Sequence, residues 1–135
     1  MIRVVFIFFL IFTGCNKKIY TRIYNKRLAN EPLSCINIKG DNLIIKNMLL
    51  KNSFVKKLYK KRCEYILKIS SNYITSCSSI KAKTFGSDFD GFVRFDLFKD
   101  SIHFYRIQKD FKGEFSQKEL NLIVDKMKRD LKFQY

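Results

Sequence analysis

Residues 92–108 read FVRFDLFKDSIHFYRIQ. In the first half an apolar residue stands at every second position from Val93 to Leu97, with charged residues between, which is the period of a β-strand. Residues 99–101 predict a turn, and residues 102–108 return along the first strand. The segment therefore predicts a β-hairpin. Both faces of the hairpin carry apolar side chains, so we expect helices on one face and a partner or ligand on the other.

The C-terminal part of the chain predicts an amphipathic helix over residues 116–132. Ser116 is a favourable N-cap and Glu119 stands three positions later, which together form a capping box. Phe115 before the cap is placed to pack on Leu120 as a hydrophobic staple. The apolar side chains recur at helical spacing and form one stripe, made of Leu120, Ile123, Val124, Met127 and Leu131. We expect this stripe to cover the sheet.

Residues 41–62 allow two interpretations. In the first, Asp41 caps one long helix whose apolar residues follow at helical spacing. In the second, residues 43–45 pair with residues 35–38 as a hairpin, and a shorter helix begins near Ser53. Both interpretations predict a helix over at least residues 53–62.

Further strands are expected at residues 65–69 and, as a second extended segment, at residues 73–83. Residues 86–91, GSDFDG, predict a turn. Together with the hairpin and the C-terminal helix, this order predicts an α+β fold. We expect a small antiparallel sheet of three to five strands, covered on one face by two helices. The folded part is expected to be a single domain over residues 34–135.

The first fifteen residues, MIRVVFIFFLIFTGC, have the layout of a secretory signal, with a basic end, a short apolar run and small residues before Cys15. A cysteine at this place resembles the lipobox of bacterial lipoproteins. The resemblance implies that residues 1–14 are removed and that Cys15 carries acyl chains that hold the protein on a membrane. The alternatives are an uncleaved anchor, for which the apolar run is about half the usual length, and an ordinary secreted protein.

Residues 15–33 then predict a lipidated cysteine followed by a basic tether that leads to the domain. Asn16 stands where lipoproteins retained at the inner membrane carry Asp. The resemblance therefore implies the bacterial cell envelope, and within it the periplasmic side of the outer membrane more than the inner membrane.

The chain is strongly basic. It has 27 Lys and Arg against 12 Asp and Glu among 135 residues, and removal of the signal takes away only Arg3, so the formal charge falls from +15 to +14. Such a charge predicts attraction to anionic surfaces, among them phospholipid head groups, lipopolysaccharide, cell-wall polymers and nucleic acid. A genome rich in A and T would produce the same excess of Lys without a functional cause.

Three cysteines remain after Cys15, which is assigned to the lipid. An exported protein with this number is expected to form one disulfide and keep one free thiol. Cys63 and Cys77 would be the neighbouring pair if they lie on adjacent segments, although the spacing does not fix the connectivity. The spacing also lacks the short paired elements of a zinc site, so no metal is expected.

The sequence shows no catalytic signature. His103 is the only histidine and alternates within a predicted strand, so a surface or half-buried imidazole is expected there. Asp88 and Asp90 resemble the start of a calcium loop that lacks its other carboxylates. Neither a nucleophile elbow nor a glycine-rich phosphate loop is present. We therefore expect a protein that is not an enzyme and has no cofactor.

A group of cations surrounds the hairpin and is the candidate site for an anionic ligand. Its members are Arg94, Arg106, Lys109 and Lys112. With Phe104 and Tyr105 they would make a basic, aromatic surface of the kind that binds lipopolysaccharide or nucleic acid. The alternative is a sheet face with solvated charged side chains.

In element order, anchoring and charge, the chain resembles the lipopolysaccharide-assembly lipoproteins of the LptE class. That resemblance implies a protein that associates with an outer-membrane barrel, with cations near lipid A phosphates, and it assigns no individual residue. The first hypothesis is thus a non-catalytic, membrane-anchored envelope lipoprotein that acts through a membrane or envelope protein partner, in outer-membrane or lipopolysaccharide assembly. The alternative is a cationic binding module for an anionic polymer, either lipopolysaccharide, cell wall or DNA, with nucleic acid the least favoured.

Overall fold

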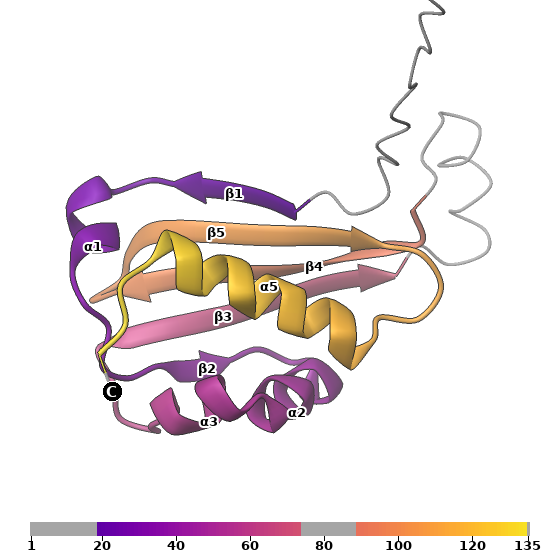
Figure 1. The fold of residues 1–135 in the computed structure, drawn as a ribbon, viewed down its shortest axis with the longest axis horizontal. Helices are drawn as coiled ribbons and strands as arrows, with labels where there is room; N and C mark the ends of the chain where they lie inside the picture. The colour runs from indigo at the N-terminus through magenta and orange to yellow at the C-terminus, as the bar shows by residue number, and fades with distance from the viewer. Residues whose placement is uncertain (1–18, 74–88, 135) are drawn as a thin grey trace, which may run out of the picture.

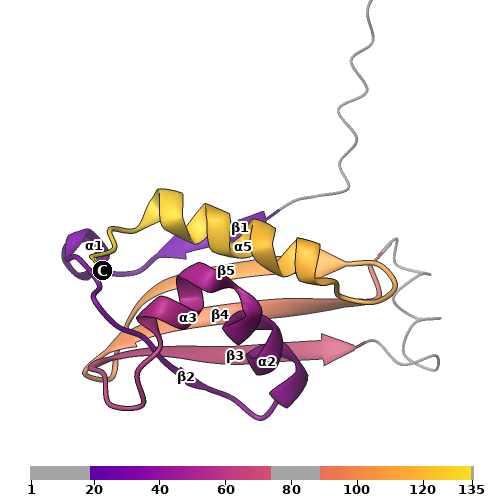
Figure 2. The same cartoon turned by 60° about the horizontal axis from the view of Figure 1, so that its bottom comes forward.

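The structure, a computed structural model, describes residues 19–73 and 89–134. In this part of the chain five strands form one sheet in the order β1-β5-β4-β3-β2, and helices α2, α3 and α5 lie on one side of it (Figures 1 and 2). The elements are β1 (Ile19–Ile23), α1 (Lys26–Asn30), β2 (Asn37–Lys39), α2 (Leu43–Lys51), α3 (Ser53–Leu58), β3 (Tyr65–Tyr73), β4 (Gly91–Lys99), β5 (Ile102–Phe111) and α5 (Gln117–Asp130). The predicted α+β fold is confirmed.

The predicted hairpin is β4 and β5, which pair antiparallel along their whole lengths. Asp100 and Ser101 connect them with φ angles of 47° and 67°. Two central residues with positive φ are the feature of a type I′ turn, whose twist matches that of the paired strands. The register shifts between Leu97 and Phe98, which marks a β-bulge.

The sheet is mixed, whereas an antiparallel sheet was expected. β2 pairs with β3 in parallel, with Ile38 opposite Leu67, while the other neighbours are antiparallel. The reason is the connection, because α2 and α3 lie between β2 and β3 and return the chain to the same end of the sheet.

Helix α5 has the predicted cap. The Ser116 hydroxyl accepts from the Glu119 backbone N–H at 3.3 Å, and the Glu119 carboxylate accepts from the Ser116 N–H at 3.2 Å. The predicted apolar stripe from Leu120 to Leu131 is buried in the core with the inward side chains of the sheet. One of these is Tyr105, whose hydroxyl donates to Asp130 at 2.7 Å.

Neither interpretation of residues 41–62 is correct as a whole, although a helix does begin at Ser53, as the second interpretation expects. Asn42 caps α2, and Asn52 ends α2 and caps α3, so two short helices replace one long helix or a hairpin. The Asn52 side chain accepts from the N–H groups of Phe54 and Val55, which competes with continuation of α2. α3 ends at Leu58, earlier than the predicted end at residue 62.

The prediction of a tether over residues 15–33 is wrong from residue 19 onward. β1 is the edge strand next to β5, with Ile19 opposite Lys109, and α1 follows it. Leu28 and Leu33 are buried in the core. The apolar residues that interrupt the basic segment are therefore part of the domain, which begins at or before Ile19 and not near Ser34.

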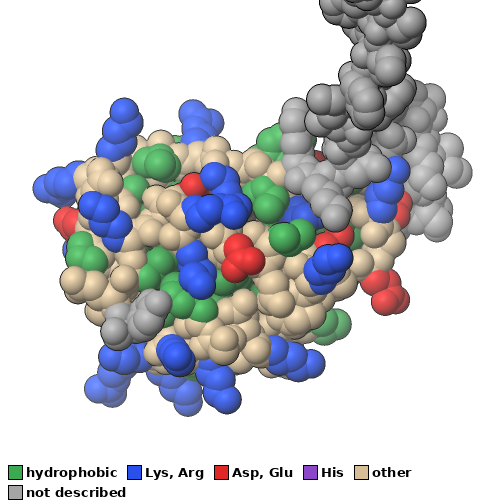
Figure 3. All heavy atoms as spheres, in the orientation of Figure 1, with side chains coloured by type: hydrophobic (Ala, Val, Ile, Leu, Met, Phe, Trp, Pro, Cys, Tyr) green, Lys and Arg blue, Asp and Glu red, His purple; other side chains and the backbone are tan. Residues whose placement is uncertain are grey.

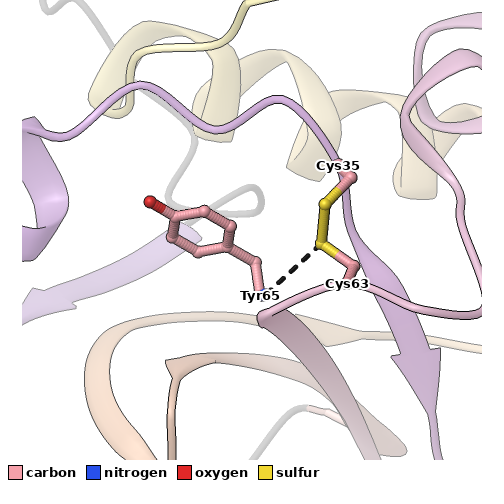
Figure 4. Close-up of a disulfide and its surroundings, with 3 residues drawn as sticks. All are labelled: Cys35, Cys63 and Tyr65. Atoms are coloured by element: carbon pink, nitrogen blue, oxygen red, sulfur yellow. Dashed lines mark hydrogen bonds between the residues drawn. A yellow bond between two sulfur atoms is a disulfide. The ribbon is translucent and has the colours of Figure 1, made fainter.

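The disulfide joins Cys35 to Cys63, so the expected pairing of Cys63 with Cys77 is wrong (Figure 4). Ile36 and Tyr59 form a parallel bridge that brings the two segments together, and the Cα atoms of the two cysteines are 6.0 Å apart. Cys63 Sγ also accepts from the Tyr65 backbone N–H at 3.3 Å. Cys77 lies outside the described residues.

Other predictions also fall outside the described residues: the signal over residues 1–14, Cys15, most of the extended segment at residues 73–83, and Asp88. Asp90 is one of the described residues of the predicted turn over residues 86–91. Its carboxylate accepts from the Gly113 backbone N–H at 2.8 Å. This carboxylate therefore joins the start of β4 to the loop after β5.

Candidate functional site

Within residues 19–73 and 89–134, helices α2, α3 and α5 cover one side of the sheet, and we call the other side the open face (Figure 2). The register of the strands places the same alternate positions of neighbouring strands on this side. Its side chains on β1, β4 and β5 are Tyr20, Arg22, Phe92, Arg94, Asp96, Phe98, His103, Arg106, Gln108 and Asp110. Over these three strands the open face therefore combines arginines and aromatic rings with two carboxylates, those of Asp96 and Asp110.

A hollow of about 270 Å³ lies on the β1 side of the open face. Its lining residues are Tyr20, Thr21, Arg22, Tyr24, Arg94, Arg106 and Gln108. Three guanidinium groups and two phenol rings meet there, and none of these lining residues is acidic. The hollow, which we call the arginine hollow, is the candidate site.

Arg22 and Arg106 stand directly opposite each other across β1 and β5. Like charges at directly opposed positions destabilise a sheet. Both guanidinium groups lie over the Tyr24 ring, at 4.9 Å and 5.7 Å from its centroid, which compensates part of this cost. Asp96, which pairs with Arg106, compensates a further part of it.

Arg94 is positioned by a neutral partner. Its Nε and Nη2 donate to Gln108 Oε1 at 3.0 Å and 2.7 Å, and Gln108 in turn donates to Asp110 at 3.0 Å. Arg94 also lies 5.0 Å from the centroid of the Phe92 ring. The side chain is therefore oriented while its positive charge has no direct counter-charge in these contacts.

Arg106 has a counter-charge, since its Nε donates to Asp96 Oδ1 at 2.6 Å. The hydrogen bond to Asp96 raises the pKa of the Arg106 guanidinium, so the side chain keeps its charge. Asp96 is itself buried in the sheet face. Asp96 therefore holds the Arg106 guanidinium in a fixed geometry in the arginine hollow and balances its charge.

His103 stacks on Phe98 with ring centroids 4.7 Å apart, and the Tyr24 ring lies tilted against it at 4.3 Å. Its Nε2 lies 2.8 Å from Asp96 Oδ1, but the ring is oriented so that this nitrogen has no hydrogen-bond partner in the described structure. His103 therefore lies next to two aromatic rings and to the Asp96 carboxylate, which accepts a hydrogen bond from Arg106.

The four cations predicted from sequence do not form one group. Arg94 and Arg106 share the arginine hollow, as expected. Lys109 is buried on the side of the helices, 3.7 Å from a Glu119 oxygen, so its assignment to the anionic-ligand surface is wrong. Lys112 is exposed beyond the end of β5, near Lys109. Alternation along a strand places Arg106 and Lys109, three residues apart, on opposite faces.

Sequence reasoning missed Arg22 and the two tyrosines of the arginine hollow, because it assigned them to a tether. In residues 19–24, IYTRIY, the β-branched residues Ile and Thr alternate with Tyr and Arg. This period-two pattern is the signal that could have identified β1 and its outward residues.

Among residues 19–73 and 89–134, no group of three or more His, Cys, Asp or Glu side chains is placed to hold a metal ion. No helix within the same ranges has the length and apolar character needed to span a bilayer. Comparisons of the chain with protein-family models, with curated proteins and with solved structures found no match.

Proposed function

We propose that this protein is a non-catalytic lipoprotein of the bacterial envelope that binds an anionic polymer, such as lipopolysaccharide, in the arginine hollow. Cys15 carries the lipid anchor, and the protein stands on the periplasmic side of the outer membrane. The sequence alone favoured a protein partner over an anionic polymer, and the present proposal reverses that preference. The reason for the reversal is the arrangement of charges on the open face.

The observation that carries the proposal is the position of Arg22 and Arg94 around Arg106, in a hollow whose lining, among the described residues, includes no carboxylate. Asp96 balances Arg106, whereas Arg22 and Arg94 have no ion pair within residues 19–73 and 89–134. Guanidinium groups donate planar pairs of hydrogen bonds that match phosphate and carboxylate oxygens. The phenol rings of Tyr20 and Tyr24 offer apolar faces beside these donors. Phosphorylated sugars of lipopolysaccharide present both kinds of surface.

Replacement of Arg22 and Arg94 by glutamine is expected to weaken binding to lipopolysaccharide about 30-fold, at about 1 kcal/mol for each exposed charged contact. Arg106 is left in place because its removal would leave Asp96 buried without its partner. The measurement is titration of the full chain in detergent with labelled lipopolysaccharide. Binding should also weaken steeply between about 50 mM and 300 mM salt.

The matched control is Lys112→Gln with Lys118→Gln, which removes the same charge from two exposed residues away from the arginine hollow. This control should change the affinity less than about threefold. Equal losses in both double variants would show that net charge alone causes binding and would contradict the proposed site. Recovery of one envelope protein in a salt-resistant pull-down, with unchanged lipopolysaccharide binding in the Arg22 and Arg94 variant, would favour the protein-partner hypothesis.

The anchor has a separate test. Cys15→Ser should leave the signal uncleaved or release the protein from membranes, because no acyl chain can then be attached to residue 15. The measurement is membrane fractionation together with the mass of the purified chain. A variant that is cleaved and fractionates like the wild type would rule out lipidation at Cys15.

A further inference from the structure

A second cationic surface lies on the other side of the molecule from the arginine hollow. We call it the cationic loop, and it covers the end of α3 and the loop that follows. Its charged residues are Lys56, Lys57, Lys60, Lys61 and Arg62, all of them exposed. The sequence has no acidic residue between Asp41 and Glu64. Figure 3 shows Lys and Arg side chains along the edge of the molecule where α2 and α3 lie.

Three carboxylates of the described domain are engaged in ion pairs away from the cationic loop. Glu31 pairs with Lys99, Asp96 with Arg106 and Asp130 with Lys126. Within residues 19–73 and 89–134, no ion pair includes a cation of the cationic loop. The loop therefore has five positive charges without an ion pair among the described residues, and Glu64 is the carboxylate nearest to them in sequence.

The backbone of the cationic loop is fixed at both of its ends. Ile36 donates to the Leu58 carbonyl at 2.9 Å, and Lys60 donates to the Ile36 carbonyl at 3.0 Å. The disulfide from Cys35 to Cys63 holds the residue that follows Arg62 (Figure 4). A charged segment with a fixed backbone loses less conformational entropy on binding than a flexible tail.

We propose that the cationic loop binds the head groups of an anionic phospholipid bilayer. Lysine clusters of this size attract anionic lipid at about 1 kcal/mol for each charge near the surface. Between residues 56 and 62 the only aromatic residue is Tyr59, which is half-buried and lies under Lys46, so the loop lacks the exposed rings on which nucleic acid bases stack.

The choice of a bilayer rests on the lipid anchor of the proposed function. Cys15 precedes Ile19 by four positions, so at about 3.5 Å per residue Ile19 lies within about 14 Å of the lipidated residue, which keeps the domain next to the membrane. Because β1 and β2 are the two edges of the sheet, the cationic loop beside β2 would give a second contact away from the anchor. Helices α2, α3 and α5 share one side of the sheet, so contact through the helical side leaves the open face directed away from the lipid (Figure 2). The arginine hollow is then free to take its ligand.

The test compares partition of the full chain into two kinds of vesicle, one of phosphatidylcholine alone and one with about 30% phosphatidylglycerol. Glutamine at Lys60, Lys61 and Arg62 should lower partition into anionic vesicles about 30-fold, after salt screening, and leave partition into neutral vesicles unchanged. The anchor contributes equally to both vesicles. Loss of binding to neutral vesicles in a Cys15→Ser chain therefore reports on the anchor alone.

The matched control spreads the same loss of charge over three exposed residues outside α2, α3 and α5, Lys26→Gln, Lys39→Gln and Lys68→Gln. This control should lower partition less than about fivefold. An equal loss in both triple variants would overturn the proposal, since net charge would then explain the binding. A cationic-loop variant that loses affinity for a polyphosphate but not for anionic vesicles would also overturn it, in favour of a soluble polyanion.

Discussion

Replacement of Cys35 and Cys63 together by alanine is expected to lower the free energy of unfolding by about 3–4 kcal/mol. The disulfide closes a segment with a sequence separation of 28 residues, which contains β2, α2 and α3. In the unfolded chain this cross-link removes conformational entropy, and the loss of the link restores it. A domain of about 120 residues has a total stability of about 5–15 kcal/mol, so the expected loss is a large part of it.

The measurement is urea unfolding of the oxidised protein and of the double variant at one pH. Cys77→Ala is the matched control, and it should leave both the stability and the Cys35–Cys63 cross-link unchanged. Peptide mapping of the oxidised chain gives the pairing directly. A cross-link from Cys63 to Cys77, or a loss of stability below about 1 kcal/mol, would refute the assigned disulfide.

The elements predicted correctly from sequence are those whose signals are local. The hairpin from residue 92 to residue 108 has its alternation and its turn within one segment, and α5 carries its cap at Ser116 and Glu119. In both cases the residues that form the element also determine where it begins. No distant partner is needed to identify them.

The elements predicted wrongly depend on distant partners or on a single polar side chain. β2 has three residues and exists because it pairs with β3. The segment of β1 has the composition of a basic tether, and its pairing with β5 is what makes it a strand. Asn52 separates α2 from α3 and donates to Asn121 at 3.0 Å, a contact that links residues 69 positions apart.

The arginine hollow could be predicted only in part, because it depends on the β-bulge. On the turn side of the register shift at Leu97 and Phe98, His103 lies opposite Phe98. On the other side of the shift, Arg106 lies opposite Asp96. The extra residue places His103 and Arg106, three positions apart, on the same face of the sheet. Without the bulge Arg94 would face Ile107 in place of Gln108, and nothing local in the sequence marks this shift.

Substitution of Gly91 by valine is expected to destabilise the domain by about 4 kcal/mol, at the upper end of what overpacking produces. A Cβ at this position would lie 2.3 Å from the Asn72 carbonyl oxygen and 2.8 Å from Phe111 Cζ. The carbonyl belongs to β3, which pairs with β4 in this region, so the clash can be relieved only by separating the two strands. Gly113→Ala is the matched control, because its Cβ meets nothing within 4 Å and only its φ of 68° opposes the change.

For Gly113→Ala the expected cost is about 1 kcal/mol, from backbone strain alone. Thermal and urea unfolding of both variants separate the two causes, since the steric term acts only at Gly91. The clash at Gly91 should also disturb the arginine hollow, because Arg94 stands on β4 only three residues after Gly91. Gln108 orients Arg94 across the β4–β5 pair. Gly91→Val should therefore weaken lipopolysaccharide binding even below its unfolding temperature, whereas Gly113→Ala should not. Equal stability of the two variants would mean that β3 and β4 are not packed as closely at Gly91 as the Asn72 contact requires.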